Sequence, residues 1–217
     1  MNASKRVDFI KNWITDYVQS MPKKASTLVV GVSGGIDSAV VSTISSMTGL
    51  KTFVLSMPIK QIKTQDDLSK LHCKWLVSNF KNVSYLNVDL DNVFSSFENA
   101  LGENNSEHAF ANSRARLRMT TLYQVAGSNN GIVVGTGNKV EDFGVGFYTK
   151  YGDGGVDISP IADCTKSQVW EMGEFLEIDH KIISAPPTDG LWVDGRNDED
   201  QLGMTYKELE EAMENPK

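Results

Sequence analysis

Residues 33–38 read Ser-Gly-Gly-Ile-Asp-Ser and lie between a run of strand-forming residues and a helical pattern. The two glycines let the backbone turn tightly and approach a ligand, because no Cβ stands in the way. The N–H groups and the positive dipole end of the following helix favour an anion. The hydroxyls of Ser33 and Ser38 add donors for phosphate oxygens. The sequence therefore predicts a phosphate-binding loop.

Asp37 is the unusual member of this loop, because a carboxylate repels a phosphate unless a cation lies between them. Mg²⁺ favours one or two carboxylates together with substrate phosphates, so a bridging Mg²⁺ resolves the conflict. The alternative is an ordinary acid in the first turn of a helix, where acids are common. The chain has neither the G-x-x-x-x-G-K-[ST] spacing of a Walker A loop nor the G-x-G-x-x-G spacing of a dinucleotide-binding turn.

The elements that must position this loop are predicted from apolar patterns. Strand-length runs that are apolar almost throughout are typical of parallel strands buried on both faces. They cover residues 28–32, 52–57, 83–88 and 132–135. Helical patterns cover residues 4–20, 36–47, 66–80, 91–101 and 107–127. This alternation predicts an α/β fold, a doubly wound parallel sheet with helices on both faces, whose ligands bind beyond the carboxyl ends of the strands.

The texture changes after the fourth predicted strand. Residues 135–160 hold seven glycines and show no helical periodicity, which favours a functional segment. Thr165-Lys166-Ser167-Gln168 is a capping-box pattern that predicts a helix to about residue 176. Thr205-Tyr206-Lys207-Glu208 predicts the last helix in the same way. We expect a surface loop over residues 184–203.

Composition limits the class of protein. The 217 residues are 40% hydrophobic, enough for one domain over residues 1–217. The net charge of −7 argues against extended nucleic-acid binding, which depends on Lys and Arg. No apolar run approaches membrane-spanning length, and the first residues do not resemble a secretory signal. Cys73 and Cys164 are too few for a metal cluster or a disulfide framework, so we expect a cytoplasmic protein without nucleic-acid or membrane partners.

The loop resembles the SGGxDS pyrophosphate loop of the N-type ATP pyrophosphatases, which cleave ATP between its α and β phosphates and activate a substrate oxygen as an adenylate. Three later motifs resemble NAD synthetase, and together they span nearly the whole chain. They are Asn112-Ser113-Arg114-Ala115-Arg116-Leu117-Arg118-Met119, Gly135-Thr136-Gly137-Asn138-Lys139-Val140-Glu141 and Phe147-Tyr148-Thr149-Lys150-Tyr151-Gly152-Asp153-Gly154-Gly155-Val156-Asp157. The resemblance implies an ammonia-dependent synthetase with an adenine nucleotide α-hydrolase-like fold.

The resemblance also implies roles for individual residues. Asp37 and Glu141 would bind Mg²⁺, and Arg116, Lys150 and Asp157 would bind deamido-NAD. Asp153 and Lys166 would act near the reaction centre. The ATP-binding set would be Gly31, Val32, Ser33, Gly34, Gly35, Ile36, Asp37, Ser38, Thr136, Lys166 and Thr188. Lys166 would lie in the first turn of its helix, which is unfavourable for a cation unless it faces an anion.

The implied reaction amidates deamido-NAD with ammonia in two steps, forming NAD, AMP and pyrophosphate from ATP through an adenylate. The family also implies a homodimer. We expect residues 142–160 to act as a lid that keeps water from the adenylate. With the motifs beginning by residue 33 there is no room for a glutamine amidase domain, so ammonia would be free or supplied by a partner.

Two features depart from the family pattern. Between Glu141 and Gly146 the chain carries one residue more than some members, so lid contacts there do not transfer. Members usually continue to a C-terminal His-Lys pair that contacts deamido-NAD, whereas this sequence stops at Lys217; we expect that an ordered tail is missing from it.

Two other functions remain possible on these residues. One is a different SGGxDS enzyme, such as a tRNA-modifying or other amide-forming synthetase; a tRNA-modifying enzyme would call for basic patches and often a catalytic cysteine. The other is a regulatory module that binds ATP without turnover. The combination of Asp37, Glu141 and Lys166 favours turnover, because a sensor needs no second metal carboxylate.

Overall fold

A computed structural model describes residues 1–61, 63–188 and 197–214. Its strands form a parallel sheet in the order β3-β2-β1-β4. The strands are β1 (Thr27–Gly31), β2 (Lys51–Ser56), β3 (Val83–Asn87) and β4 (Gly131–Val134). Each predicted strand is confirmed to within a residue or two at its ends. Strand β1 pairs with β2 on one side and with β4 on the other, so the strand order reverses at β1. In sheets of this kind ligands bind at the carboxyl ends of the strands next to such a reversal, here β1 and β4.

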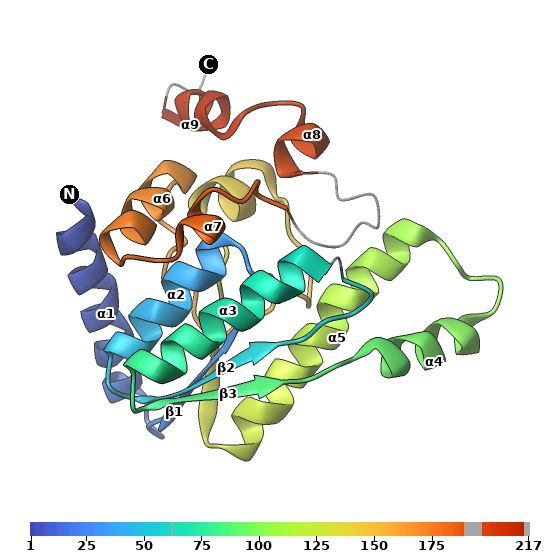
Figure 1. The fold of residues 1–217 in the computed structure, drawn as a ribbon, viewed down its shortest axis with the longest axis horizontal. Helices are drawn as coiled ribbons and strands as arrows, with labels where there is room; N and C mark the ends of the chain where they lie inside the picture. Colours follow the sequence, from blue (N-terminus) through green and yellow to red (C-terminus); the bar gives the residue numbers. More distant parts are fainter. Residues whose placement is uncertain (62, 189–196, 215–217) are drawn as a thin grey trace.

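The helices follow the predicted alternation. They are α1 (Ala3–Ser20), α2 (Ile36–Met47), α3 (Lys63–Asn79), α4 (Asp91–Leu101), α5 (Glu107–Ser128), α6 (Lys166–Phe175), α7 (His180–Ile183), α8 (Asp198–Leu202) and α9 (Tyr206–Glu214), with a π-helix, η1, at Lys139–Val145. Figure 1 shows α1, α2 and α3 side by side, and α8 and α9 at the upper end of the molecule.

Alternating side chains of β1 divide the core between the two faces of the sheet. Leu28 and Val30 pack with the buried faces of α1, α2 and α6. Val29 packs on the other face with residues of α4 and α5, among them Phe94 and Leu122. Since β1 is buried on both sides, its run of apolar residues is explained, and the predicted layers of helices on both faces are confirmed.

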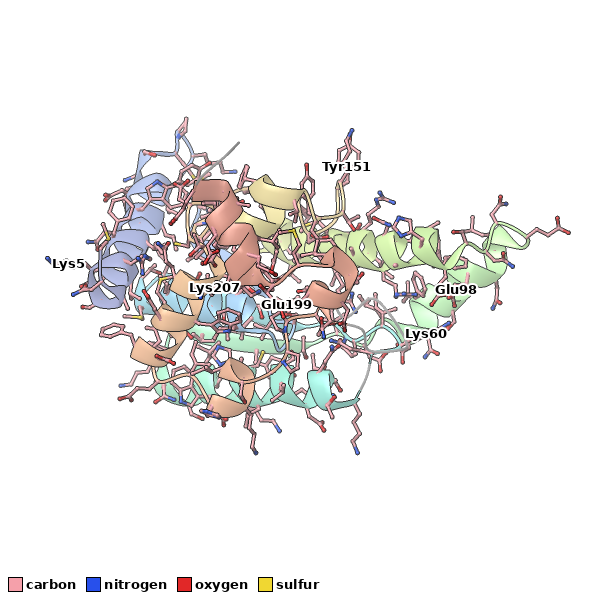
Figure 2. The ribbon with its side chains drawn as sticks, turned by 90° about the horizontal axis from the view of Figure 1, so that it is seen from above. Lys5, Lys60, Glu98, Tyr151, Glu199 and Lys207 are labelled. Carbon is pink, nitrogen blue, oxygen red and sulfur yellow. The ribbon has the colours of Figure 1, made fainter. Side chains whose placement is uncertain are left out.

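One part of the fold projects from these layers. Figure 1 shows α4 and the first turns of α5 extending beyond the sheet as an arm. At its root the Lys60 ammonium contacts the Glu98 carboxylate of α4, and Figure 2 shows the two side chains close together. Arg114 of α5 lies over the Phe94 ring, 5.6 Å from its centroid. Lys60 therefore fixes α4 to the body by an ionic contact, and Arg114 joins α5 to α4 by a cation–π contact.

Two segments without helical periodicity contain a short helix, and for residues 184–203 this makes the predicted loop wrong in part. Residues 135–160 contain η1, whose wider turn does not produce the 3.6-residue periodicity that reveals an α-helix. The loop expected over residues 184–203 contains α8, which is too short to show a period. The remainder of that loop at residues 189–196 lies outside the described residues. Both predicted capping boxes are present, with Thr165 and Gln168 at α6 and with Thr205 and Glu208 at α9.

The described residues include no helix long and apolar enough to cross a membrane. Cys73 and Cys164 are both buried and are not joined in a disulfide. Burial raises the pKa of the Cys73 thiol to about 12, so this thiol stays protonated and unreactive.

Candidate active site

The loop between β1 and α2 has the backbone that a close approach to an anion requires. Gly34 has φ +96°, and a Cβ at this position would lie 2.6 Å from the carbonyl oxygen of Gln65. Gly35 is the N-cap of α2 and makes no side-chain capping bond, which leaves the first N–H groups of the helix directed at the loop. An anion at this helix start would take those donors.

The two loop serines hold this shape. The backbone N–H of Ser33 donates to Ser38 Oγ over 3.1 Å, and Ser38 Oγ donates to the carbonyl oxygen of Gly35 over 3.0 Å. Ser33 Oγ accepts the N–H of Gly35 over 3.3 Å and is exposed. The Ser38 hydroxyl therefore stabilises the loop, whereas the hydroxyl of the exposed Ser33 is the one placed to contact a ligand.

Three charged side chains meet beside the loop. Lys166 Nζ lies 2.6 Å from Asp37 Oδ2 and 2.8 Å from Glu141 Oε1. Asp37 belongs to the first turn of α2, Glu141 to η1 beyond β4, and Lys166 is the first residue of α6. Only 2% of the Lys166 side chain is exposed. Lys166 lies in the first turn of α6, where a cation is unfavourable unless it faces an anion. Asp37 and Glu141, the two carboxylates that the family resemblance assigns to Mg²⁺, are the anions that it faces.

Asn138 fixes the geometry of this cluster from within. Its Nδ2 donates to Asp37 Oδ1 over 3.0 Å, while its Oδ1 accepts the N–H groups of Val140 and Glu141 over 3.0 and 3.1 Å. Asn138 is fully buried and is the N-cap of η1. One amide therefore joins the start of η1 to the phosphate loop and sets the separation of Asp37 and Glu141.

Electrostatics within the cluster follow from one cation among several acids. Burial alone would lower the pKa of Lys166, but the charges and hydrogen bonds of Asp37 and Glu141 outweigh it and raise that pKa, so the ammonium stays charged. Burial raises the pKa of Asp37, and the Glu141 charge adds to this against the effect of Lys166. For Glu141, burial is outweighed by Lys166 and the Tyr206 hydroxyl, and its pKa is lowered.

Asp142 lies next to the cluster, and its pKa responds to the negative charge there. Burial, followed by the charges of Asp153, Glu141 and Asp37, raises its pKa to about 7. One ammonium cannot neutralise this many carboxyl groups at neutral pH, so the cluster has an excess of negative charge that a divalent cation would relieve.

The residues fit the predicted Mg²⁺. Asp37 and Glu141 supply hard carboxylate oxygens that converge on one cation, here the ammonium of Lys166. Within residues 1–61, 63–188 and 197–214, no group of three or more His, Cys, Asp or Glu side chains is arranged to hold a metal by itself. That combination suits a metal bound jointly by two protein carboxylates and substrate phosphates, rather than one held in a protein cage.

The residues predicted to bind deamido-NAD lie along α5 and the segment after η1. Arg116 is exposed on α5, and its Nε donates to the carbonyl oxygen of Lys150 over 3.0 Å. Lys150 Nζ lies 5.1 Å from the centroid of the Tyr151 ring. Tyr151 is 72% exposed, and Figure 2 shows it pointing away from the body of the molecule. Arg116 and Lys150 therefore form a positive edge beside an exposed aromatic ring.

Asp157 is engaged by the chain itself. Its Oδ2 accepts the N–H of Val133 in β4 over 2.8 Å, and its Oδ1 accepts the hydroxyl of Tyr123 over 3.2 Å. Burial and the Asp157 carboxylate raise the pKa of Tyr123 to about 12, so the phenol stays protonated. In this structure Asp157 anchors the end of the segment to the sheet and orients Tyr123.

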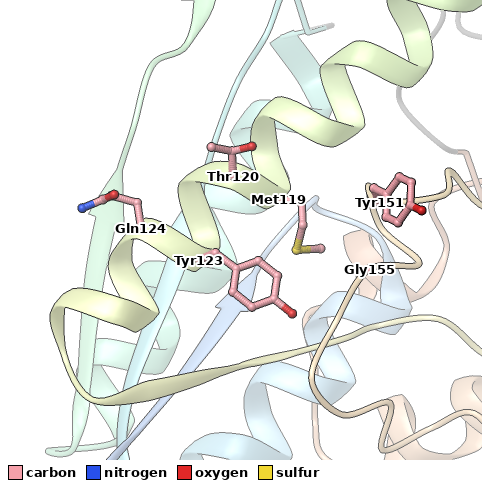
Figure 3. A pocket seen from close by; sticks show the side chains of 6 residues that line it. All are labelled: Met119, Thr120, Tyr123, Gln124, Tyr151 and Gly155. Atoms are coloured by element: carbon pink, nitrogen blue, oxygen red, sulfur yellow. The ribbon is translucent and has the colours of Figure 1, made fainter.

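A cavity of about 500 Å³ lies between α5 and the segment that follows η1. Figure 3 shows Met119 and Tyr123 pointing from α5 toward the chain that carries Tyr151 and Gly155. The cavity is lined by Met119, Thr120, Tyr123, Gln124, Tyr151 and Gly155. Arg116, Lys150 and Asp157 do not line this cavity themselves. Lys150 lies over the ring of its lining residue Tyr151, and Asp157 accepts a hydrogen bond from its lining residue Tyr123.

The remaining predicted residues lie at the borders of these two groups. Asp153 accepts the backbone N–H of Thr149 at both carboxylate oxygens, 3.1 and 3.3 Å away. Thr136 is half-buried between β4 and η1, and Thr188 is the last described residue before residues 189–196. The structure therefore brings the phosphate loop, Asp37, Glu141 and Lys166 together, whereas Arg116, Lys150 and Asp157 lie outside the lining of the cavity between α5 and the segment after η1.

The sequence pattern did not reveal three members of the site. Asn138 lies within a quoted motif, but its amide carries no signal of the cap that it makes. Tyr206, whose hydroxyl donates to Glu141 Oε1 over 2.6 Å, comes from the distant α9. Tyr123 was part of a helical pattern only. The helical pattern over residues 107–127 could have shown which face of that helix carries Tyr123. The contact of Tyr206 with Glu141, in contrast, depends on the tertiary fold.

Comparisons with known proteins agree with this arrangement. The model of the family described as NAD synthase matches residues 6–216. The NH(3)-dependent NAD(+) synthetase of Carboxydothermus hydrogenoformans is 38% identical and aligns over 98% of this chain and 86% of its own length. The solved NMN synthetase of Francisella tularensis superposes with a TM-score of 0.91 at 32% identity, over 100% of this chain and 88% of that one.

A second solved relative is the NH3-dependent NAD synthetase of Campylobacter jejuni, crystallised with a nitrate ion. It has a TM-score of 0.75 at 30% identity and covers 84% of this chain and 77% of its own. Sequence and fold agree over nearly the whole chain: it belongs to the NAD synthase family.

Proposed function

We propose that the chain catalyses the ATP-dependent amidation of deamido-NAD with ammonia, giving NAD, AMP and pyrophosphate. The observation that carries this proposal is the meeting of Asp37, Glu141 and Lys166 beside the Gly34–Gly35 turn at the carboxyl end of β1. A phosphate-binding helix start with adjacent metal ligands suits the cleavage of a nucleoside triphosphate. Membership of the NAD synthase family supports the acceptor.

The reaction has two balanced steps. An oxygen of the nicotinate carboxylate attacks the α-phosphorus of ATP, and the bond to the β-phosphate oxygen breaks to release pyrophosphate. Ammonia then attacks the acyl carbon of the adenylate, AMP leaves with the bridging oxygen, and the nitrogen loses a proton. Both steps join two reactants in a fixed orientation, so positioning contributes a large share of the rate.

We assign the protein's part as follows. The N–H groups at the start of α2 and the Ser33 hydroxyl bind the departing pyrophosphate. Lys166 supplies a permanent positive charge for the α-phosphate, since its pKa is raised. Arg116 and Lys150 hold the pyrophosphate of the acceptor, and Asp153 acts near the activated carbonyl. Thr136 and Thr188 complete the ATP site.

We further propose that Asp37 and Glu141 hold a Mg²⁺ ion. When bound, the ion would stabilise the negative charge that develops on the transferring phosphorus and on the leaving group. The excess negative charge of Asp37, Glu141 and Asp142 around one ammonium supports a divalent cation here. Removal of divalent cations should therefore abolish pyrophosphate release.

A second acceptor is favoured by one finding. A solved structure with a TM-score of 0.91 is named an NMN synthetase, and formation of that product by amidation would start from nicotinate mononucleotide. This acceptor lacks the adenosine half of deamido-NAD. Relatives at 37–38% identity, named NAD(+) synthetases, favour the dinucleotide. We therefore keep deamido-NAD as the first candidate and the mononucleotide as the second.

A steady-state assay of pyrophosphate release separates these possibilities. The protein is supplied with ATP, Mg²⁺ and ammonia, and with deamido-NAD, nicotinate mononucleotide or no acceptor. We expect the highest kcat/KM with deamido-NAD and no release without an acceptor. Asp37→Asn keeps the shape of the side chain and should lose activity by at least about 100-fold. A higher kcat/KM with the mononucleotide would transfer the proposal to that acceptor, and release from ATP alone would contradict amidation.

We also propose that the protein works in the cytoplasm as a homodimer, as one domain that carries the whole reaction. Two buried free thiols are typical of a reducing compartment. Val93 and Phe97 of α4 are 53% and 43% exposed on the arm, which supports an interface there. Sedimentation equilibrium should give twice the chain mass of 23.9 kDa.

A further inference from the structure

The C-terminal helix α9 packs on both elements that bring Glu141 and Lys166 together. Leu209 of α9 shares a small buried cluster with Val140 of η1. A Cβ at Gly144 would lie 2.6 Å from the Sδ of Met213, so η1 and α9 approach closely. Glu210 Oε1 accepts the N–H of Ser167 in α6 over 2.8 Å. Figure 2 shows α8 and α9, marked by Glu199 and Lys207, lying over this part of the molecule.

Tyr206 is the α9 residue that reaches the charged cluster. It is 1% exposed, and its ring packs edge-on against Trp170 with centroids 6.0 Å apart. Its hydroxyl lies 2.6 Å from Glu141 Oε1 and 3.0 Å from Asp198 Oδ2. The ring also lies beneath Lys166 Nζ, 4.9 Å from its centroid. Contacts with Trp170, Asp198 and Lys166 thus fix the Tyr206 side chain in addition to its hydrogen bond with Glu141.

Oxygen Oε1 of Glu141 accepts from two donors of different kinds. Lys166 is charged, and a bound phosphate would compete with Glu141 for it. Tyr206 is neutral, because a phenol keeps its proton at neutral pH, and its hydroxyl donates to both Glu141 and Asp198. A phosphate therefore does not draw this donor away. The Tyr206 bond can persist while the Lys166 contact changes.

From these contacts we propose that Tyr206 is a positioning residue, which holds Oε1 of Glu141 so that this carboxylate keeps the orientation needed to bind a divalent cation. The inference rests on the proposed function for its kinetic consequence, but the bond to Glu141 is a feature of the fold. Partners of a metal ligand of this kind typically change metal affinity or activity about 10- to 100-fold when they are removed. Tyr206 does not touch the reacting atoms and acts only through Glu141.

The direct test measures Mn²⁺ binding to the whole chain with a non-hydrolysable ATP analogue present at the same concentration in every sample, and free Mn²⁺ is detected by electron paramagnetic resonance. Tyr206→Phe removes the hydroxyl and keeps the ring. Leu209→Ala is the matched control, because it weakens the packing of α9 in the same buried cluster and leaves the Tyr206 hydroxyl in place. We expect Mn²⁺ affinity to fall about 10-fold or more in Tyr206→Phe, and to stay near the wild-type value in Leu209→Ala.

Kinetics provide the second readout. In Tyr206→Phe the Mg²⁺ concentration for half-maximal amidation should rise by a similar factor, while kcat at saturating Mg²⁺ stays near that of the wild type. Unchanged Mn²⁺ affinity in Tyr206→Phe, an equal loss in Leu209→Ala, or a wild-type chain that binds no Mn²⁺ would each overturn the proposal. A wild-type chain that binds Mn²⁺ but amidates neither acceptor would overturn the proposed function and leave the Mn²⁺ comparison to decide on Tyr206.

Discussion

The contact of Lys166 with Asp37 and Glu141 shows what residue types alone can and cannot reveal. An acid in a phosphate loop and a lysine in the first turn of a helix each conflict with their local surroundings, and both conflicts pointed to an ionic partner. The sequence did not indicate that the two conflicts resolve each other. That contact joins residues 129 positions apart, and it exists only because β1 and β4 are neighbours in the sheet.

Removing the ammonium should destabilise the protein. Lys166→Met leaves Asp37 and Glu141 buried together, and breaking a buried ion pair typically costs about 3–5 kcal/mol of unfolding free energy. Mg²⁺ should restore part of this loss and raise the melting temperature of the variant more than that of the wild type. Lys207→Met, on the exposed side of α9, is the control for loss of a lysine. Wild-type stability of Lys166→Met, measured by urea unfolding, would contradict the role of the cluster.

A second prediction concerns the buried imidazole of His72. Burial lowers its pKa from 6.5 to about 4, although its contact with the carbonyl oxygen of Ala39 opposes the shift. The unfolded chain therefore takes up a proton below pH 6.5 that the folded chain takes up only near pH 4. Stability is unaffected above pH 6.5 and falls as the pH drops through this window, by up to about 3 kcal/mol.

The measurement is the unfolding free energy in urea at pH 7.5 and pH 4.5, for the wild type and for His72→Gln. The variant should be less stable at both values, because it loses the stacking contact with Trp75. Its loss between the two values should nevertheless be smaller than in the wild type. Parallel pH profiles of the two proteins would show that His72 is not the titrating group.

Elements determine how the site residues are presented. The capping box of Thr165 and Gln168 starts α6 at Lys166, and Asn138 starts η1 two residues before Val140. The first was predictable, because its pattern is local. The second was not, since a π-helix has no sequence period and an asparagine is also common in turns. A π-helix has a wider turn than an α-helix, and the extra residue expected between Glu141 and Gly146 stays a prediction.

That residues 142–160 act as a lid stays a prediction. Phe143, Tyr148 and Tyr151 are exposed in this segment, which is unfavourable for three aromatic rings unless they cover a ligand. Amide hydrogen exchange in this segment should slow when an ATP analogue and deamido-NAD bind, whereas peptides from β1 should change little. Equal exchange with and without the ligands would contradict closure.

At the scale of the whole molecule, the fold was the most predictable feature. Apolar strand runs that alternate with helices allow few topologies, and the parallel sheet with helices on both faces follows from them. The docking of α9 on η1 was not predictable, because Tyr206, Leu209 and Met213, which take part in it, have no special spacing. The cavity between α5 and the segment after η1 was likewise not predictable, since that segment has no periodicity.

The central claim is that a carboxylate of the acceptor attacks the α-phosphate of ATP, and it can be followed by isotope. The substrate is deamido-NAD that carries ¹⁸O in both oxygens of the nicotinate carboxylate. It is incubated with ATP, Mg²⁺, ammonia and the protein, and the masses of the products are measured by mass spectrometry. We predict one ¹⁸O atom in AMP, one in the amide of NAD and none in pyrophosphate. Unlabelled AMP, or label in pyrophosphate, would contradict the adenylate and with it the proposed function.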